Sequence, residues 1–480
     1  MSGFSHSLYR ILITDTRDRL WRLDLMATVF EEKNISKAVL RMGLPAMLGQ
    51  LTTLIYNIAD TFFVSLTKEP AMIAAVTLCT PILLIIMSIA SVFGMGGNSV
   101  IARLLGEDKN KEVKKTLNFC LYAMALSGIM ILLAGIFFME PIARLSGADA
   151  ENMVYTKDYL KYIFLGAPFI IISNGLVHLF RSMGFIKEST IGLALGNSIN
   201  IVFDFVFIVL LDWGTAGAAL ATSFGFFCST IYYLVCMIGA ERKGNQLVAL
   251  SIKQFAPHKK MVASVVGIGI PGALITVLLS VSNIVLNNFI GIYGSDAVAS
   301  YGIAYKVDMV PIMLSVGLSQ GVAPLIGYYY GAGRRERMSQ AMKTSTIYGI
   351  LLGAIFLAVF CLLGTNLASV FLHDESLIHQ TGYFIGILGL SAPMLGIINM
   401  VTSYFQALGV AAKSLLITIM RNVVLFIPAV ILLNRIWQLN GVIAAQPIVE
   451  TILAIVCIIM YAKDSSVQRH VPLDKQSISQ

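Results

Sequence analysis

Twelve apolar segments follow one another along this chain, with only short polar stretches between them. Each is about 20 residues or longer, which is the length that a helix needs to cross a ~30 Å hydrocarbon core. Hydrophobic residues make up 57% of the chain and charged residues only 12%, against about 25% charge in soluble proteins. We therefore predict an all-α membrane protein with twelve transmembrane helices. The segments lie at about 39–64, 71–97, 116–138, 159–180, 190–211, 215–239, 262–290, 297–326, 342–364, 378–400, 412–433 and 440–462.

The two halves of the chain are diverged copies of each other. At an offset of 225 residues, Gly96 matches Gly321, Gly106 matches Gly331, and Pro168 matches Pro393. Each half has an even number of crossings, so we expect parallel repeats about an axis along the membrane normal, facing a cavity that opens to either side. The predicted parts are a cytoplasmic N-terminal segment 1–37, an N-lobe 38–240, a cytoplasmic linker 241–261, a C-lobe 262–463 and a cytoplasmic tail 464–480.

Basic residues set the predicted orientation. Placing both termini and the even-numbered loops on one side collects 27 of the 34 Lys and Arg residues, while five fall on the other side and two, Lys306 and Arg421, lie within or at the edge of apolar segments. By the positive-inside rule both termini are cytoplasmic, and we expect a multi-pass protein of the plasma (inner) membrane. Residues 1–37 contain no apolar core of a signal peptide. They form an amphipathic surface segment, or the reading frame begins at Met26; both interpretations stay open.

Two aspartates inside apolar segments are the strongest candidates for function, because an ionisable group at mid-bilayer is costly. Asp60 lies in the first segment with Tyr56 one turn earlier, and Asp204 lies in the fifth, four residues after Asn200. Such a set suits either an oxygen cage for Na⁺ or a pair of desolvated acids that bind a proton. The competing interpretation is helix packing through hydrogen bonds, which we favour for Asn197 and for Thr222 taken alone. Asn57 and Asn197 are also candidates for the wall of a substrate cavity, and Asn174 is a further polar residue of this half.

The second half has no equivalent acids, since Leu425 and Ala429 stand where the repeat would place Asn200 and Asp204. Its polar candidates for a cavity wall are Asn283, Asn287 and Gln320. Two interpretations stay open for Arg421 and Glu450, namely a buried structural ion pair and a role in gating. Lys306 and Asp308 are expected at the membrane interface.

Several motifs resemble the multidrug and toxic compound extrusion (MATE) family, and most closely its MepA-like bacterial branch. They include YNIADTFFV, GMGGNSVIARLLGEDKNKEV and NGLVHLFRSMGFIKES in the first half, and GLSQGVAPLIGYYYGAG and SYFQALGVAAKS in the second. The resemblance implies a twelve-helix, two-lobe antiporter that expels cationic and amphipathic compounds in exchange for H⁺ or Na⁺. It also implies a cation site in the N-lobe, with Tyr56 one turn from the first acid. The residues that match this site are Asp60, Asn174, Asn200, Asp204 and Thr222.

Two departures from the family pattern limit this transfer. The sequence lacks the acids that some members place in the seventh and tenth helices, so a cation mechanism in the C-lobe is not expected. Phe205 follows Asp204 where the family often has proline, which leaves the bending of that helix open.

The predicted function is therefore secondary active efflux by alternating access, with a lipid-linked oligosaccharide flippase of the same superfamily as the alternative and a passive channel as a third reading. No Walker-type nucleotide motif and no catalytic or metal motif is visible, so we do not expect an enzyme. The expected partners are the lipid bilayer and small organic cations, with no nucleic acid. We expect no cofactor beyond the coupling ion, and a functional monomer.

Overall fold

The computed structural model of this chain describes residues 29–67, 69–248 and 258–468. Most of the predicted N-terminal segment, the centre of the predicted linker and the end of the predicted tail lie outside these residues. Within the described ranges the chain forms helices and no strand. This confirms the predicted all-α fold class.

Two compact units organise the described helices. Unit 1 contains residues up to 277 together with 316–345 and 406–412, and unit 2 contains 278–315, 346–405 and residues from 413 onward. Unit 1 thus combines the predicted N-lobe with parts of the predicted C-lobe, and the lobe boundaries stay a prediction.

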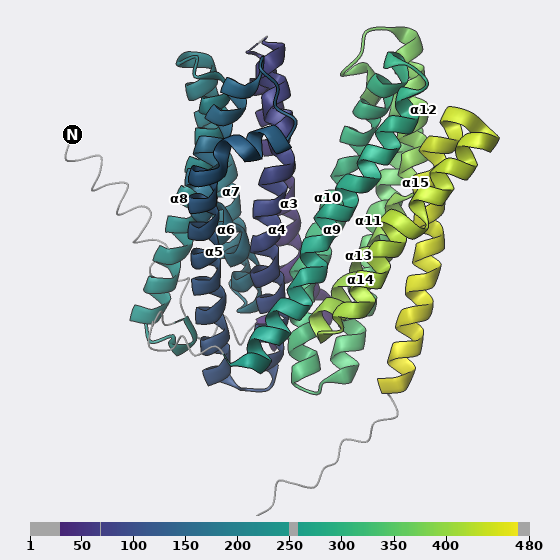
Figure 1. Ribbon diagram of the computed structural model, residues 1–480. Coiled ribbons are helices and arrows are strands. Elements are labelled where there is room, and N and C mark those ends of the chain that lie inside the picture. The colour runs from purple at the N-terminus through teal and green to yellow at the C-terminus, as the bar shows by residue number, and fades with distance from the viewer. Residues whose placement is uncertain (1–28, 68, 249–257, 469–480) are drawn as a thin grey trace, which may run out of the picture. The chain divides into compact units, whose positions relative to one another are not determined.

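The first six predicted crossings form long helices, all of which belong to unit 1 (Figure 1). Helix α6 packs against α4, α5 and α8, and α3 packs against α7. The fifth crossing changes its winding after Asp204, where a π-helix, η1, continues α7. The elements are α3 (Ile35–Ser65), α4 (Pro70–Gly106), α5 (Asn110–Leu145), α6 (Met153–Ser182), α7 (Ile186–Asp204), η1 (Phe205–Leu210) and α8 (Gly214–Arg242).

The second half repeats this succession of helices. The tenth crossing is a pair of helices bent by 41° at a short break. A π-helix, η4, interrupts the eleventh crossing. The elements are α9 (Lys259–Gly291), α10 (Ser295–Gly331), α11 (Arg335–Ser369), α12 (Glu375–Gly389), α13 (Ala392–Leu408), α14 (Ala411–Ile419), η4 (Met420–Val424) and α15 (Phe426–Gln468).

The last two crossings form a hairpin inside one continuous helical stretch. Ala411–Asp464 is 54 residues long, far more than one crossing needs. Gln438 has φ 52° and ψ −134°, a conformation outside the helical region, and Figure 1 shows that the chain of α15 turns back on itself. A Cβ on Gly441 would collide with the Leu433 carbonyl, so the two arms touch backbone to backbone. Ten helices in the described chain are long and apolar enough to span a membrane, and the α12–α13 pair adds an eleventh. Dividing α15 at Gln438 gives the predicted twelve.

The internal repeat is visible in how helices cross within unit 1. A Cβ on Gly106 of α4 would collide with the Tyr328 carbonyl of α10, and a Cβ on Gly331 of α10 would collide with the Arg103 carbonyl of α4. Residues 103 and 328 are also 225 apart. The same close contact is therefore made twice, once from each copy of the repeat.

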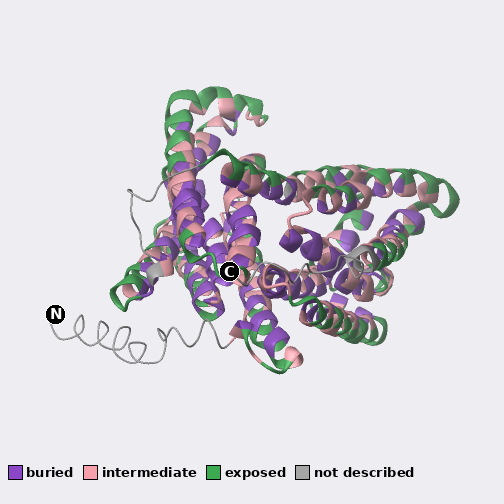
Figure 2. Cartoon of the chain, turned by 90° about the horizontal axis from the view of Figure 1, so that it is seen from below, coloured by how far each residue is buried: buried purple, intermediate pink, exposed green. Residues whose placement is uncertain are grey.

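The outward sides of the helices carry large apolar side chains, as expected where lipid replaces water. On α5, Leu126, Met130, Leu133 and Phe137 are all exposed and follow one face of the helix. Figure 2 shows exposed residues in green strips along the helices, opposite buried faces in purple. These strips support a chain that is embedded in a bilayer.

A short segment before α3 is attached to α10 and α11 inside unit 1. The Phe30 ring stacks on Tyr328 with centroids 4.7 Å apart. Glu31 accepts hydrogen bonds from Tyr328 (2.8 Å) and Arg334 (2.5 Å). Arg337 donates to the Glu32 carbonyl. The described part of the N-terminal segment is thus anchored by charge-assisted hydrogen bonds.

Candidate functional site

The fifth crossing positions Asp204 at the junction of α7 and the π-helix η1. The side chain is fully buried, and neither carboxylate oxygen has a hydrogen-bond partner among the described residues. A buried carboxylate without partners is costly, and π-helices occur frequently at functional sites. Both features are typical of functional residues and make Asp204 a candidate for such a role.

Asp60 of α3 is the second acid of this site, as the sequence predicts. It is close enough to Asp204 for the two carboxyl groups to interact electrostatically. Within the part of the chain that the structure describes, neither acid forms an ion pair. The site can therefore lower its electrostatic energy by binding a positive charge, either a proton or a metal cation.

Three predicted ligands lie beside the acids. Asn200 donates from Nδ2 to the Thr222 hydroxyl at 3.1 Å, while its Oδ1 has no partner among the described residues. The Tyr56 hydroxyl also interacts with Thr222. The side chains of Tyr56, Asn200 and Thr222 line a cavity of about 10 Å³, which is on the order of the space for one water-sized sphere. The structure thus brings together Asp60, Asp204, Tyr56, Asn200 and Thr222.

The other predicted residues of this half have different surroundings. Asn174 donates from Nδ2 to the Ile170 carbonyl of its own helix (2.9 Å). Asn197 lines the same cavity, but its amide nitrogen lies 3.1 Å and 3.2 Å from the hydroxyls of Thr52 and Thr53 on α3. This contact agrees with the packing role that we favour for Asn197. Asn57 is exposed.

Sequence reasoning missed one aromatic residue of this site. Tyr159 of α6 is buried and interacts electrostatically with Asp60, Asp204 and Tyr56. It stands in an apolar segment, where a tyrosine is a common residue, so only the tertiary structure singles it out.

A second polar cluster in unit 1 contains Gln320 of α10. Its Oε1 accepts hydrogen bonds from Arg181 Nη1 (3.0 Å) and from Gln50 Nε2 (3.1 Å). Arg181 is fully buried at the end of α6, although its position near a basic loop is typical of a residue that marks topology. Gln320 therefore ties α3, α6 and α10 together.

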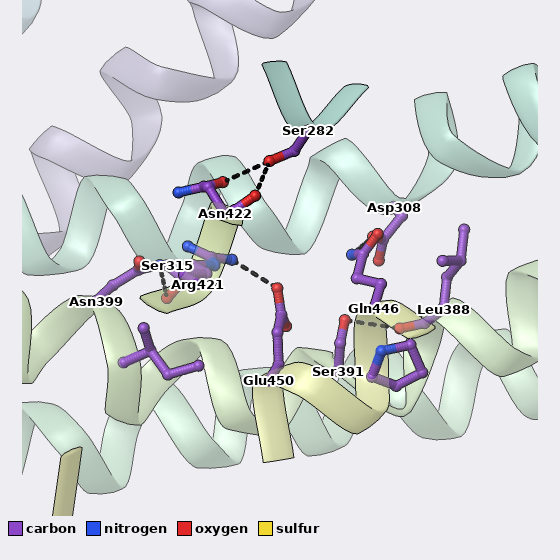
Figure 3. Close-up of polar contacts among 12 residues, drawn as sticks. Ser282, Asp308, Ser315, Leu388, Ser391, Asn399, Arg421, Asn422, Gln446 and Glu450 are labelled. Atoms are coloured by element: carbon purple, nitrogen blue, oxygen red, sulfur yellow. Dashed lines mark hydrogen bonds and ion pairs between the residues drawn. The ribbon is translucent and has the colours of Figure 1, made fainter. Parts of the chain in front are cut away.

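The other candidates of the second half, Asn283, Asn287, Arg421 and Glu450, lie in unit 2. Asn283 interacts with the Tyr305 hydroxyl, and Asn287 is exposed. Arg421 Nη2 donates to Glu450 Oε1 at 2.6 Å (Figure 3). The two residues thus form the ion pair that is one of the readings from the sequence.

Asp308 is not at the membrane interface, contrary to expectation. Helix α10 begins at Ser295, so Asp308 lies 13 residues into it, roughly 20 Å along the helix. The side chain has no exposed surface, while its neighbour Lys306 is exposed.

The donor set around Asp204 fits a proton or a small hard cation, because its free atoms are carboxylate and amide oxygens. Among the described residues, no three or more His, Cys, Asp or Glu side chains gather where they could hold a metal ion. Any metal cation would therefore depend on amide, hydroxyl or carbonyl oxygens besides the two acids.

Comparisons with known proteins agree with this architecture. The MatE family model matches residues 45–206 and 271–432, one match in each half. The chain is 30% identical to the multidrug export protein MepA of Staphylococcus aureus over 432 residues, which are 90% of this chain and 94% of that protein. It is 29% identical to the MepA protein of Staphylococcus saprophyticus over 431 residues, again 90% and 94% of the two chains.

Solved structures show the same fold. A MATE protein in complex with MaD3S matches with a TM-score of 0.87 and 22% identity, covering 94% of this chain and 100% of that one. An outward-facing multidrug resistance MATE family transporter matches with a TM-score of 0.86 and 22% identity, covering 94% and 99%. Two matched repeats, long relatives and a shared fold together place this chain in the MATE family of membrane transporters.

Proposed function

We propose that this protein is a secondary active antiporter that exports cationic or amphipathic organic compounds in exchange for H⁺ or Na⁺. The observation that carries the proposal is the state of Asp204, which is fully buried with both oxygens unpartnered beside a second acid. The similarity to multidrug export proteins supports the substrate class. Transport by alternating access follows from the two repeats.

The two acids couple the ion to the substrate because both positive charges compete for the same negative site. When Asp60 and Asp204 carry no ion, the site is negative and attracts a positive charge. When they have bound an ion, the site is closer to neutral, and its attraction for an organic cation falls. Export is driven only if the ion binds the outward-facing and inward-facing states with different affinity.

Export of ethidium from proteoliposomes, with an imposed pH or Na⁺ gradient, tests the proposal. We expect one gradient to drive export and Asp60→Asn and Asp204→Asn each to lower the rate by about 5-fold to 150-fold, the range of a typical coupling energy. Asp158→Asn is the matched control, because Asp158 is an exposed carboxylate on α6. Gradient-driven export at the wild-type rate in both Asp60→Asn and Asp204→Asn would remove this site from the mechanism.

The flippase alternative is tested by the same vesicles loaded with a lipid-linked oligosaccharide. The relatives and the solved structures above give it no added support. Flux of the lipid-linked sugar without flux of ethidium would favour it over antiport.

A further inference from the structure

A cluster of three ionisable groups in unit 2 is not used by the proposed mechanism. They are Asp308 on α10, Arg421 on η4 and Glu450 on α15, and Figure 3 shows them around one polar region of the unit. Arg421 is committed to Glu450 by a hydrogen bond of 2.6 Å. The Glu450 side chain is 5% exposed and the Arg421 side chain 27% exposed, so the pair is mostly shielded from solvent.

Asp308 lacks a cation of its own. Its Oδ2 accepts one hydrogen bond, from Gln446 Nε2 at 3.1 Å. Its Oδ1 has no hydrogen-bond partner among the described residues, and the residue has no exposed surface. Asp308 also lies within electrostatic range of both Glu450 and Arg421, without a direct hydrogen bond or ion pair to either among the described residues.

The charges of this cluster do not balance when both acids are ionised. One guanidinium faces two carboxylates, which leaves a net charge of about −1 in a buried environment, and burial of an uncompensated charge costs several kcal/mol. Two neighbouring carboxyl groups that cannot both ionise share a proton. Among the described residues, Tyr301 and Tyr305 on α10 and Cys457 on α15 are further titratable groups that interact with members of this cluster. All three are uncharged as phenol or thiol, so none supplies the missing positive charge.

We propose that Asp308, Glu450 and Arg421 form a second proton-binding site, separate from the Asp60–Asp204 site, and that Asp308 carries the proton. A proton suits this place because it occupies no volume, whereas a hydrated cation would have to displace packed side chains around a residue with no accessible surface. Protonation brings the cluster to neutrality and keeps the Gln446 hydrogen bond to Oδ2. This proton is bound whether or not the protein exports organic cations. A contribution of this second site to the export cycle rests on the proposed function.

Infrared spectroscopy of the full chain in lipid nanodiscs tests this site directly. A protonated carboxyl group absorbs apart from a carboxylate, and ¹³C labelling of the aspartate carboxyl carbons assigns the band to Asp. At neutral pH we expect a protonated-Asp band that Asp308→Asn removes. Asparagine has the shape of the protonated acid and keeps the acceptor for Gln446, so this variant should elute as a folded protein. Asp296→Asn, an exposed acid on the same helix, is the matched control and should leave the band unchanged.

Two further variants isolate the signal of unit 2 and test the role of Glu450 in it. Because Asp60 and Asp204 can add to the same band, the comparison is repeated in an Asp60→Asn/Asp204→Asn background, where only the unit 2 signal should remain. In Glu450→Gln, Arg421 is released to pair with Asp308, and the band should disappear although Asp308 is present.

An unchanged band in Asp308→Asn would overturn the proposal, because Asp308 would then be ionised. A band that persists at full strength in Glu450→Gln would overturn the shared cluster, because burial alone would hold the proton. Absence of gradient-driven ethidium export by the wild-type protein, with the protonated-Asp band present, would count against the proposed function and not against this site.

Discussion

A pair of glycines at equivalent places in the two repeats offers a sharp test of helix packing. A Cβ on Gly128 of α5 would lie 2.5 Å from Pro168 Cα on α6. A Cβ on Gly353 of α11 would lie 2.5 Å from Pro393 Cα on α13. Both glycines and both prolines are 225 residues apart, and each contact lies within one unit. Since carbon atoms prefer separations of about 3.5–4.0 Å, an alanine at either place forces the helices about 1 Å apart.

The size of the effect follows from two opposing terms. Overpacking a tight contact costs about 1–3 kcal/mol, and the greater helix propensity of alanine returns up to about 1 kcal/mol. We therefore expect Gly128→Ala and Gly353→Ala each to lower the free energy of unfolding by about 1–2 kcal/mol. The contact is not relieved by a rotamer change, because the atom that the new Cβ meets belongs to the backbone of a proline.

Reversible unfolding by SDS in mixed micelles measures this difference. Gly267→Ala on α9 is the matched control, because a Cβ there meets nothing within 4 Å. It should change the free energy by less than about 0.5 kcal/mol or increase it. The packing argument fails if Gly128→Ala and Gly353→Ala are as stable as Gly267→Ala.

Two further predictions concern charged pairs. Arg421→Met leaves the Glu450 carboxylate buried without its partner and should cost ~3 kcal/mol, at the lower end for a broken buried pair because Arg421 is 27% exposed. Arg421→Met/Glu450→Leu should recover most of that loss in the same SDS titration, and a double variant no more stable than Arg421→Met would refute a simple ion pair. Burial alone would raise the pKa of Glu31, but the hydrogen bonds from Arg334 and Tyr328, with the charges of Arg334 and Arg337, lower it below its ordinary value of 4.5. At pH values above 4.5, the contacts of Glu31 should therefore stabilise the folded state by up to about 1 kcal/mol, and this contribution should be lost as pH falls through the folded-state pKa. The measurement is the difference in the free energy of unfolding between wild type and Glu31→Gln. A difference that grows on acidification would contradict this sign.

The predicted crossings agree with the structure because hydropathy decides them. Backbone groups in a bilayer must be satisfied internally, so each long apolar segment becomes a helix whatever its neighbours are. The tenth crossing, predicted over 378–400, is an α12–α13 pair bent by 41°. Gly389 and Pro393 flank the break, yet Pro168, the repeat match of Pro393, lies inside the continuous helix α6, so these residue types alone do not fix the angle. The π-helix after Asp204 shows that the winding of that helix changes without a proline after the acid.

The candidate site was predictable in its acids and less so in its partners. Asp60 and Asp204 stand out in any apolar segment because burying a charge is costly. Asn174 and Asn200 look alike in sequence, yet one donates to its own helix and the other to Thr222. Charge counting groups Arg181 with the loops, although it is fully buried, because its sequence position at the end of α6 does not reveal which helices cover it.

The amino-acid sequence alone determined the membrane class, the twelve crossings, the duplication and the presence of two acids inside apolar segments. These properties depend on residue type summed along the chain. Only the tertiary structure decided that Asp308 is buried beside Glu450 and that Tyr159 faces the acids of unit 1. The reason is that a partner on another helix depends on how each helix begins, rotates and tilts, and packing against neighbouring helices sets those angles.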